Sequence, residues 1–462
     1  MTEAGLPSGI ILAFYGDDFT GSSAVMEVMT FAGLRAVMFV EPPTTAQLQR
    51  FADYRAVGVA SVARAQSPGW MDRHLPDAFR ALAALRAPVT HYKTCSTLDS
   101  SPTVGSIGRA IDIGVPIFCS DKSAAPWQPL VIAAPTIGRY QAFGNLFANH
   151  AGVVYRLDRH PVMQRHPVTP MQEADVARHL RQQTQRAIGL VDFAAMKDGS
   201  GQRRLEDELL AGRSILSLDV VDKETLQSVG GLIWNNRRER LFAIGSQGVE
   251  YALVAYWRAA GLLPEALPHK QVNERAQIVA VSGSVSAVTA AQIAWATAEG
   301  FDLIKLDATA SLDERQWVAA IEEAVTRARS SFSEGRSPLI ATAQGPDDPA
   351  IASLRKALGS SRLDPGTINE RIGVGLGEIL KRVISATGVK RGAISGGDSS
   401  GFAMRALGAY ALEAIAPIAP GAPLCRVFST HPIVDGFEIS LKGGQMGETS
   451  FFGSVRTGRT AN

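Results

Sequence analysis

Two acidic residues stand side by side where an apolar segment of the sequence ends. Residues 11–16 read ILAFYG, Asp17 and Asp18 follow directly, and Thr20 opens a helical pattern. Like charges in contact destabilise each other unless a cation, a hydrogen-bond donor or a proton relieves them. Capping of the next helix would account for one acid at most. We therefore expect the pair to bind a ligand or to take part in proton transfer.

A lysine and several hydroxyl groups follow another apolar segment. The candidate strand 89–94 reads VTHYKT, so Lys93 lies near its end, and Ser96 and Thr97 come next. A cation beside hydroxyl groups suits a small anionic molecule that itself carries several hydroxyls. A capped surface loop is an equally good interpretation of these residues alone. Arg64 follows a further candidate strand and could supply a second cation or lie on the surface.

Three turns rich in glycine and hydroxyl groups lie in the last part of the chain, each after an apolar segment. They read VSGSVS (281–286), ISGGDSSG (394–401) and LKGGQMGE (441–448). Such turns let backbone N–H groups approach phosphate oxygens closely. Each turn alone is weak, because glycines after strands are common, but three together indicate a nucleotide. None of them matches the P-loop or the glycine-rich loop of protein kinases.

Short apolar segments alternate with amphipathic segments along most of the chain, which is typical of crossover units around a mostly parallel sheet. We predict strands at 10–15, 35–40, 56–61, 89–94, 129–134, 188–193, 215–219 and 241–245, with helices at 75–86, 171–186 and 248–260. Residues 261–276 are polar, contain prolines and interrupt this pattern. The pattern restarts in the segments 277–284, 301–308, 337–345 and 391–401, and a hairpin is predicted at 421–447.

The fold predicted from this pattern is α/β, with two three-layer α/β/α domains that have mostly parallel sheets and are joined by a hinge. The domains extend over residues 1–260 and 277–457, with residues 261–276 as the linker. Ligands in such folds bind beyond the carboxyl ends of the strands. The first domain would present acids, hydroxyls and cations there, and the second would present the turns suited to phosphate.

Composition excludes several classes of function. The chain has 462 residues, of which 46% are hydrophobic and 19% charged, and its net charge is +2. We see no basic stripe that would favour nucleic acid, no apolar run of about 18 residues for a membrane helix and no signal peptide. Three distant cysteines suggest neither a disulfide framework nor a zinc site. We expect a cytoplasmic protein.

Together, the two groups of motifs predict phosphoryl transfer. That reaction needs positioning, charge neutralisation and a carboxylate that accepts the hydroxyl proton, and domain closure would exclude water. Phosphatases of the haloacid dehalogenase type need Asp-x-Asp, whereas Asp17 and Asp18 are contiguous. We expect one of these two carboxylates to be the base, with Asp18 slightly favoured. The other would orient the substrate or a magnesium-bound water.

The motifs YGDDFTG, YKTCSTLDSSPTVGSIGRA, VSGSVS, ISGGDSSG and LKGGQMG resemble, in this order, those of the four-carbon acid sugar kinase family. Members phosphorylate acids such as threonate, erythronate and 3-oxo-tetronate with ATP. The resemblance implies a sugar-acid site in the N-terminal domain, made by Asp17, Asp18, Arg64, Lys93, Ser96 and Thr97. It implies an ATP site in the C-terminal domain, made by Ser282, Gly283, Ser284, Gly396, Gly397, Asp398, Ser399 and Gly443.

One segment departs from the usual family pattern. TCSTLDSSPTVGSIGRA replaces a shorter segment of the type DSTLRGNIG and looks closer to a subgroup linked with 3-oxo-isoapionate, a branched sugar acid. The predicted function is thus an ATP-dependent kinase of a four-carbon or branched sugar acid, with ATP and Mg²⁺ as cofactors and no metal ligands assigned. The alternatives are a sugar-acid sensor without catalysis and a magnesium-dependent phosphatase that uses the Asp pair. We expect no nucleic-acid or membrane partner, and the hairpin could pair two protomers of a homo-oligomer.

Overall fold

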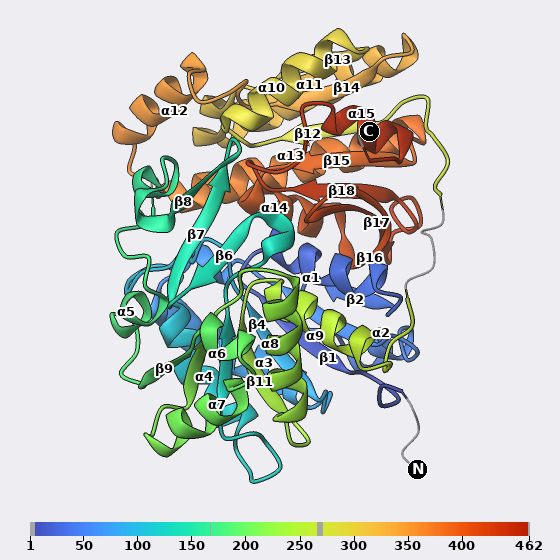
Figure 1. Cartoon of the computed structure of the whole chain (residues 1–462). Helices are drawn as coiled ribbons and strands as arrows, with labels where there is room; N and C mark the ends of the chain where they lie inside the picture. Colours follow the sequence, from blue (N-terminus) through green and yellow to red (C-terminus); the bar gives the residue numbers. More distant parts are fainter. Residues whose placement is uncertain (1–4, 167, 266–270, 461–462) are drawn as a thin grey trace. The chain divides into compact units, whose positions relative to one another are not determined.

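The computed structural model describes residues 5–166, 168–265 and 271–460 (Figure 1). It divides into two compact units. The N-terminal unit contains the described residues up to Ala36 and those from Thr44 onward into the predicted linker. The C-terminal unit contains Val37–Pro43 and the described residues from 271 onward. The prediction of two α/β domains with mostly parallel sheets is confirmed, and each unit is described separately below.

The N-terminal unit is built on a parallel sheet with the strand order β3-β1-β4-β11-β5-β10-β9. Its strands are β1 (Leu12–Gly16), β3 (Ala56–Ala60), β4 (Val89–Lys93), β5 (Gln128–Val131), β9 (Ile188–Val191), β10 (Ile215–Leu218) and β11 (Leu241–Gly245). Nearly every residue in these strands is buried. Runs of apolar residues, rather than alternation, are what a parallel sheet covered on both faces requires.

Helices cover both faces of this sheet. On one face α1 (Phe19–Phe31) and α8 (Lys223–Asn235) contact α9 (Gly248–Ala259), and on the other α3 (Pro68–Ala83) packs against α4 (Ile107–Phe118). The shorter helices of this unit are α2 (Thr45–Gln49), α5 (Val176–Arg181), α6 (Phe193–Lys197) and α7 (Gly201–Leu210). Phe79 lies 5.5 Å from the Tyr15 ring and 5.2 Å from the Phe118 ring. These aromatic contacts fix α3 and α4 on the strands that carry the candidate site.

A small antiparallel sheet of β6 (Arg139–Ala142), β7 (Asn145–His150) and β8 (Val153–Arg156) also belongs to the N-terminal unit. The sequence analysis did not predict it. Gln141 fixes it to the region after β10, because its Nε2 donates to Asp219 Oδ1 over 2.9 Å and its N–H donates to Val220 O over 2.9 Å. The sheet therefore has a defined position within the unit although its strands are short.

The C-terminal unit has a mixed sheet with the order β13-β14-β12-β15-β18-β17-β16-β2. Its strands are β12 (Val279–Ser282), β13 (Phe301–Lys305), β14 (Ser337–Ala341), β15 (Arg391–Ser395), β16 (Ala409–Ala419), β17 (Ala422–Ser429), β18 (Glu438–Lys442) and β2 (Ala36–Phe39). In this order, β13, β14, β12, β15 and β18 pair with one another in parallel. The pairs β18–β17, β17–β16 and β16–β2 are antiparallel. The predicted hairpin at 421–447 corresponds to β17 and β18.

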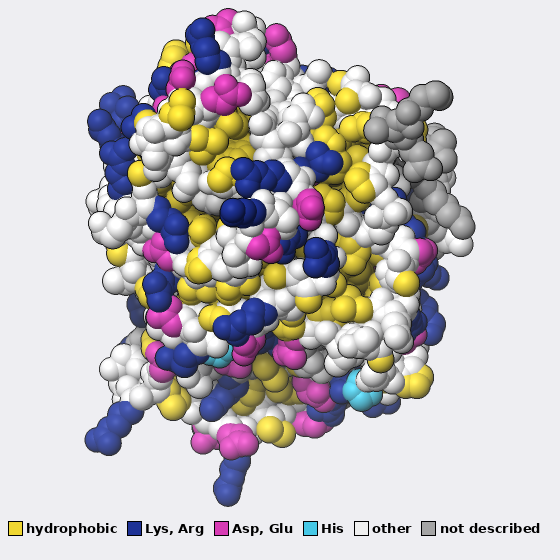
Figure 2. Space-filling view, turned by 90° about the horizontal axis from the view of Figure 1, so that it is seen from below, with side chains coloured by type: hydrophobic (Ala, Val, Ile, Leu, Met, Phe, Trp, Pro, Cys, Tyr) yellow, Lys and Arg dark blue, Asp and Glu magenta, His cyan; other side chains and the backbone are white. Residues whose placement is uncertain are grey.

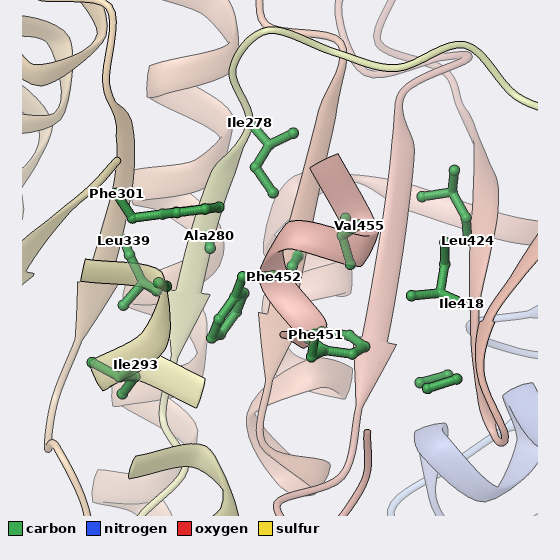
Figure 3. Close-up of a cluster of buried hydrophobic side chains, with 14 of the residues drawn as sticks. Ile278, Ala280, Ile293, Phe301, Leu339, Ile418, Leu424, Phe451, Phe452 and Val455 are labelled. Atoms are coloured by element: carbon green, nitrogen blue, oxygen red, sulfur yellow. The ribbon is translucent and has the colours of Figure 1, made fainter. Parts of the chain in front are cut away.

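Helices lie on both faces of this second sheet as well. On one side α13 (Pro365–Thr387) packs against α14 (Gly397–Leu407) and α11 (Glu314–Ser333), and on the other α10 (Ala287–Ala298) contacts α15 (Phe451–Thr457). A further helix, α12 (Pro349–Gly359), lies between β14 and α13 in the sequence. Figure 3 shows Phe451 and Phe452 of α15 among the strand residues Phe301, Leu339 and Leu424. This apolar cluster holds α15 against the strands on which the glycine-rich turns begin.

The predicted domain limits differ from the structure at one place. Residues 37–43 were assigned to the N-terminal domain, but they belong to the C-terminal unit, because β2 pairs with β16 through Phe39–Ala411 and Met38–Leu412. Sequence analysis could not predict this pairing, because the two strands are far apart in the sequence. Part of the predicted linker, residues 266–270, lies outside the described residues, so the hinge stays a prediction.

The surface carries charge of both signs. On the face in Figure 2, Lys and Arg side chains are interspersed with Asp and Glu, in line with the net charge of +2. Within the described residues, no helix has both the length and the apolar character needed to cross a bilayer.

Candidate active site

The carboxyl ends of β1, β3 and β4 bring the predicted acid-site residues together. Gly16 at the end of β1 pairs with Lys93 in β4, and the backbone N–H of Asp17 donates to Lys93 O over 3.0 Å. Arg64 lies in a short 3₁₀ helix after β3, where its N–H donates to Asp17 O over 2.9 Å. Parallel strands in register therefore place both acids and both cations at one edge of the sheet.

Asp18 is held as a carboxylate. It is the N-cap of α1, accepting from Gly21 N–H over 3.0 Å and from Thr20 Oγ1 over 2.6 Å. Arg64 Nη2 lies 3.0 Å from its Oδ2. Burial alone would raise the pKa of Asp18, but Arg64 and Lys93, together with these hydrogen bonds, lower it. Every oxygen of this side chain thus has a partner within the protein.

Asp17 is in the opposite situation although it is the adjacent residue. Its side chain is 1% exposed, and within the described residues Oδ1 has no hydrogen-bond partner. Burial and the charge of Asp18 raise the pKa of Asp17 to about 7, against the attraction of Arg64 and Lys93. A buried oxygen without a partner is rare in proteins. Asp17 therefore has both the free acceptor and the proton affinity that a general base needs near neutral pH.

Lys93 is packed tightly against the first turn of α1. Its side chain is 2% exposed, and Nζ donates to Thr94 O over 2.6 Å. A Cβ atom on Gly21 would lie 2.7 Å from Lys93 Nζ and 2.3 Å from Asp18 Oδ1. Glycine at position 21 is therefore needed for the ammonium group and the capping carboxylate to come this close to the helix.

In the segment after β4, polar side chains contact one another in succession. Thr97 Oγ1 donates to Asp99 Oδ1 over 2.8 Å and lies 3.0 Å from Cys95 Sγ. Burial and the charge of Asp99 raise the pKa of Cys95 to about 11, so the thiol stays protonated and unreactive at neutral pH. Ser96 is half-buried between these residues. Thr97 and Ser96 thus lie where the prediction placed them, in the loop that follows Lys93.

Arg139 is a candidate site residue that sequence reasoning missed. It begins β6 in the small sheet, and Cys95 and Asp99 are near enough to favour its charge. Burial nevertheless lowers the pKa of Arg139, and its buried Nε has no partner among the described residues. The only available sequence signal was an isolated glycine–arginine pair at 138–139 in a stretch without a clear pattern.

The predicted nucleotide-site residues of the C-terminal unit also converge at strand ends. Ser282 of β12 pairs with Ser395 of β15, which in turn pairs with Lys442 of β18. The Gly283 N–H donates to Ser395 O over 3.0 Å. A Cβ atom on Gly283 would lie 2.2 Å from Ser399 Oγ in the first turn of α14, so the two turns approach each other at van der Waals distance.

The remaining predicted residues line the same place. Gly396 precedes α14 and Gly397 begins it, and the Gly396 N–H donates to Lys442 O over 2.9 Å. Gly443 follows β18, and a Cβ atom on the next residue, Gly444, would lie 3.0 Å from Ser284 Oγ. The side chain of Asp398 lies outside the described set. All three glycine-rich turns thus meet at the carboxyl ends of β12, β15 and β18.

A network of hydroxyl groups connects these turns. Thr289 Oγ1, in the first turn of α10, donates to Ser284 Oγ over 2.9 Å and lies 3.1 Å from Ser286 Oγ. Ser286 is also the N-cap of α10 and donates to Gly444 O. Lys442 Nζ donates to Thr289 Oγ1 over 3.0 Å. Hydroxyl groups, helix N-termini and one lysine are the groups that bind phosphate in proteins.

Within the described residues, no group of three or more His, Cys, Asp and Glu side chains is arranged to hold a metal ion. Of the carboxylates in the acid site, Asp18 is already paired with Arg64 and Asp99 accepts from Thr97. We therefore assign no protein ligand to Mg²⁺.

Comparison with known proteins finds a match to two domain families, one in each part of the chain. The model of a sugar-binding N-terminal domain matches residues 12–253, and that of a nucleotide-binding C-terminal domain matches residues 279–452. The 3-oxo-isoapionate kinase of Paraburkholderia graminis is 47% identical over 98% of this chain and 96% of its own length. The 3-oxo-tetronate kinases of Pseudomonas savastanoi pv. phaseolicola and Cupriavidus necator are 29% and 28% identical, each over at least 96% of both chains.

Solved structures share the fold. One, described as a putative tRNA synthase from Salmonella typhimurium, matches with a TM-score of 0.76 at 21% identity, covering 97% of this chain and 99% of that one. A Haemophilus influenzae protein matches with a TM-score of 0.69 at 20% identity, covering 96% and 99%. With both domain models matched in order and a curated relative at 47% identity along its whole length, the chain belongs to the four-carbon acid sugar kinase family.

Proposed function

We propose that this protein transfers the γ-phosphoryl group of ATP to a hydroxyl group of a branched 3-oxo sugar acid of the 3-oxo-isoapionate type. The observation that carries the proposal is the buried Oδ1 of Asp17 beside Arg64 and Lys93, which has no hydrogen-bond partner in the described part of the chain. Family membership supports a sugar-acid kinase. The identity to a 3-oxo-isoapionate kinase is 47%, whereas it is 29% and 28% to the two 3-oxo-tetronate kinases named above, and this difference supports the branched acid.

Asp17 is the proposed general base, in place of Asp18. The substrate hydroxyl oxygen would attack the γ-phosphorus, its proton would pass to Asp17 Oδ1, and the bond from phosphorus to the β–γ bridging oxygen would break to release ADP. Asp18 is a poor acceptor for this proton, because Thr20, Gly21 and Arg64 already stabilise its ionised form. Its role would be to cap α1 and to hold Arg64 in place.

The cations of the site suit the acidic end of the substrate. Arg64 and Lys93 lie beside the acids, and Arg139 offers a buried Nε without a partner among the described residues. Its Nη1 already donates to the backbone carbonyls of Ile137, Gly138 and Asn149, so Nε is the donor that we offer to a substrate carboxylate. We therefore assign Arg139 to the substrate carboxylate and Thr97 with Ser96 to the substrate hydroxyls.

ATP would bind in the C-terminal unit, at the hydroxyl and glycine turns at the ends of β12, β15 and β18. Mg²⁺ remains part of the proposal, since in kinases it is held largely by the nucleotide phosphates with one or two carboxylates. Its chemistry would be to neutralise charge that develops on the phosphates. No step above is assigned to the metal.

The test is ADP release from ATP and Mg²⁺ with 3-oxo-isoapionate, 3-oxo-tetronate, threonate and erythronate as acceptors. We expect turnover with the branched acid, and a loss of at least about 100-fold in kcat for Asp17→Asn. Asp192→Asn is the matched control, because Asp192, like Asp17, directly follows a strand of the same sheet, here β9. Turnover with only the four-carbon acids would overturn the branched substrate.

Two further results would identify the alternatives. Phosphate release from a phosphorylated sugar acid without nucleotide would support a phosphatase. Binding of a sugar acid and ATP without turnover of any acceptor would support a sensor.

A further inference from the structure

Lys442 is a buried lysine that none of the site predictions assigned. It ends β18, and its side chain is fully buried. Nζ donates to Thr289 Oγ1 over 3.0 Å and to Gly443 O over 3.1 Å. Both acceptors are neutral, and no described acidic side chain forms an ion pair with this lysine. Buried lysines without an opposite charge are rare, because an isolated ammonium group is costly to desolvate.

The geometry fits an uncharged amine in the nucleotide-free protein. A neutral amine has two N–H groups, which match the two acceptors, whereas an ammonium group would bring a third donor. Around Nζ, α10 contributes the hydroxyl of Thr289, the turn after β18 contributes Gly443 O, and α15 contributes the Phe451 ring, whose centroid lies 5.7 Å away. Burial is the cause that lowers the pKa of Lys442 to about 7.

Lys442 lies where a bound nucleotide phosphate would give its Nζ the negatively charged partner that its two neutral acceptors do not provide. Its strand partner Ser395 and the network of Thr289, Ser284 and Ser286 bring it to the meeting point of the glycine-rich turns. We propose that Lys442 binds a phosphate oxygen of the nucleotide and that its Nζ takes up a proton when the nucleotide binds. This inference rests on the proposed ATP site in the C-terminal unit.

Proton uptake makes nucleotide affinity depend on pH in one direction. Below about pH 7 the lysine is already charged, so binding takes up little proton there. Above this value the free protein must acquire the proton from solvent, and the affinity is expected to fall by up to about tenfold per pH unit. Nucleotide phosphates cannot account for this trend, because their last ionisation lies near pH 6.

Isothermal titration calorimetry tests the proposal on the full-length protein with ADP, and with ATP in the absence of acceptor. Titrations at about pH 8 in buffers of different ionisation enthalpy give the number of protons taken up, which we expect to lie between about one half and one. Lys442→Arg is expected to bind nucleotide with no uptake, because arginine stays charged when buried. Lys442→Met is expected to weaken binding by at least about tenfold.

Lys305→Met is the matched control, because Lys305 also ends a strand of the same sheet but is exposed. It should leave both affinity and proton uptake unchanged. Nucleotide binding that shows the same enthalpy in all buffers would overturn the proposal for Lys442 while leaving the ATP site intact. No nucleotide binding by the wild-type protein would instead overturn the proposed function itself.

Discussion

Asp17 and Asp18 differ by one position in the chain and have opposite effects on stability. The pKa of Asp17 is raised from 3.8 to about 7 in the folded protein, so the fold favours its protonated form and loses stability as pH rises through this interval. Asp17→Asn should therefore increase the free energy of unfolding at about pH 8, by about 2–4 kcal/mol. It should change little below about pH 4. Chemical denaturation at both pH values measures this difference.

Asp18→Asn should act in the other direction. Asparagine can still cap α1, but the charge that pairs with Arg64 is lost. Because the pKa of Asp18 is lowered by its partners, its contribution to stability is present at neutral pH and disappears as pH falls below its ordinary value. We expect a loss of about 1–3 kcal/mol at pH 7 in the same denaturation experiment. Equal stability changes for the two variants would contradict the assigned roles.

The pH dependence of kcat/KM follows from Asp17 as the base. The carboxylate must be ionised to accept the hydroxyl proton, so kcat/KM should fall about tenfold per pH unit below about pH 7. A profile that stays flat down to about pH 5 would exclude a base with this raised pKa and would favour Asp18. Initial rates at low acceptor concentration give the profile directly.

Among the loops after the strands, one glycine controls the position of Arg64. Gly105 adopts a φ of +62°, and a Cβ atom there would lie 2.4 Å from Arg64 O. Gly105→Ala should therefore displace the 3₁₀ helix that carries Arg64 and raise KM for the acid by at least about tenfold. Gly212→Ala is the control, since Gly212 has a similar φ of +78° but no atom within 4 Å of the added Cβ. Both variants introduce backbone strain, but only Gly105→Ala introduces a steric clash. A difference in KM between the two variants in steady-state kinetics therefore reports the clash.

Strand ends were the part of the site that sequence could predict. Apolar runs mark buried parallel strands, and polar residues just after them must lie at one edge of a sheet. Asp17, Lys93 and the turns after β12, β15 and β18 were found in this way. Arg139 could not be found, because β6 to β8 are short, partly exposed strands without a distinct pattern. The charge state of Lys442 depends on burial and partners, which spacing does not encode.

The pairing of β2 with β16 was equally hidden. The strand itself was predicted at 35–40, and the structure has it at Ala36–Phe39. It pairs antiparallel with residues near 411. Hydrophobic periodicity shows where a strand lies in the sequence, but it does not show which distant strand it pairs with. The hydrophobic pattern therefore predicted most strands of the two large sheets, but it missed β6, β7, β8 and β16 and could not assign β2 to its unit.

At the scale of the whole molecule, the chain cannot be divided into two complete units by one cut. A fragment of residues 271–460 lacks β2, so β16 would lose the pairing that includes the Val40 N–H bond to Tyr410 O. Fusing residues 35–43 to this fragment through a flexible linker should raise its melting temperature by at least about 4 °C. The same fusion with Val40→Pro should raise it less, because proline cannot donate that hydrogen bond.

During synthesis on the ribosome, β2 must wait for β16 before the two strands can pair. Phe39 pairs with Ala411, so β2 is made about 370 residues before the strand against which it finally packs. At about 5–20 residues per second, β2 waits for roughly 20–70 s. During that time the hydrogen bonds that β2 makes with β16 in the finished C-terminal unit cannot form. The sheet of the C-terminal unit is therefore expected to gain β2 only after β16 has been translated, although β2 is synthesised first.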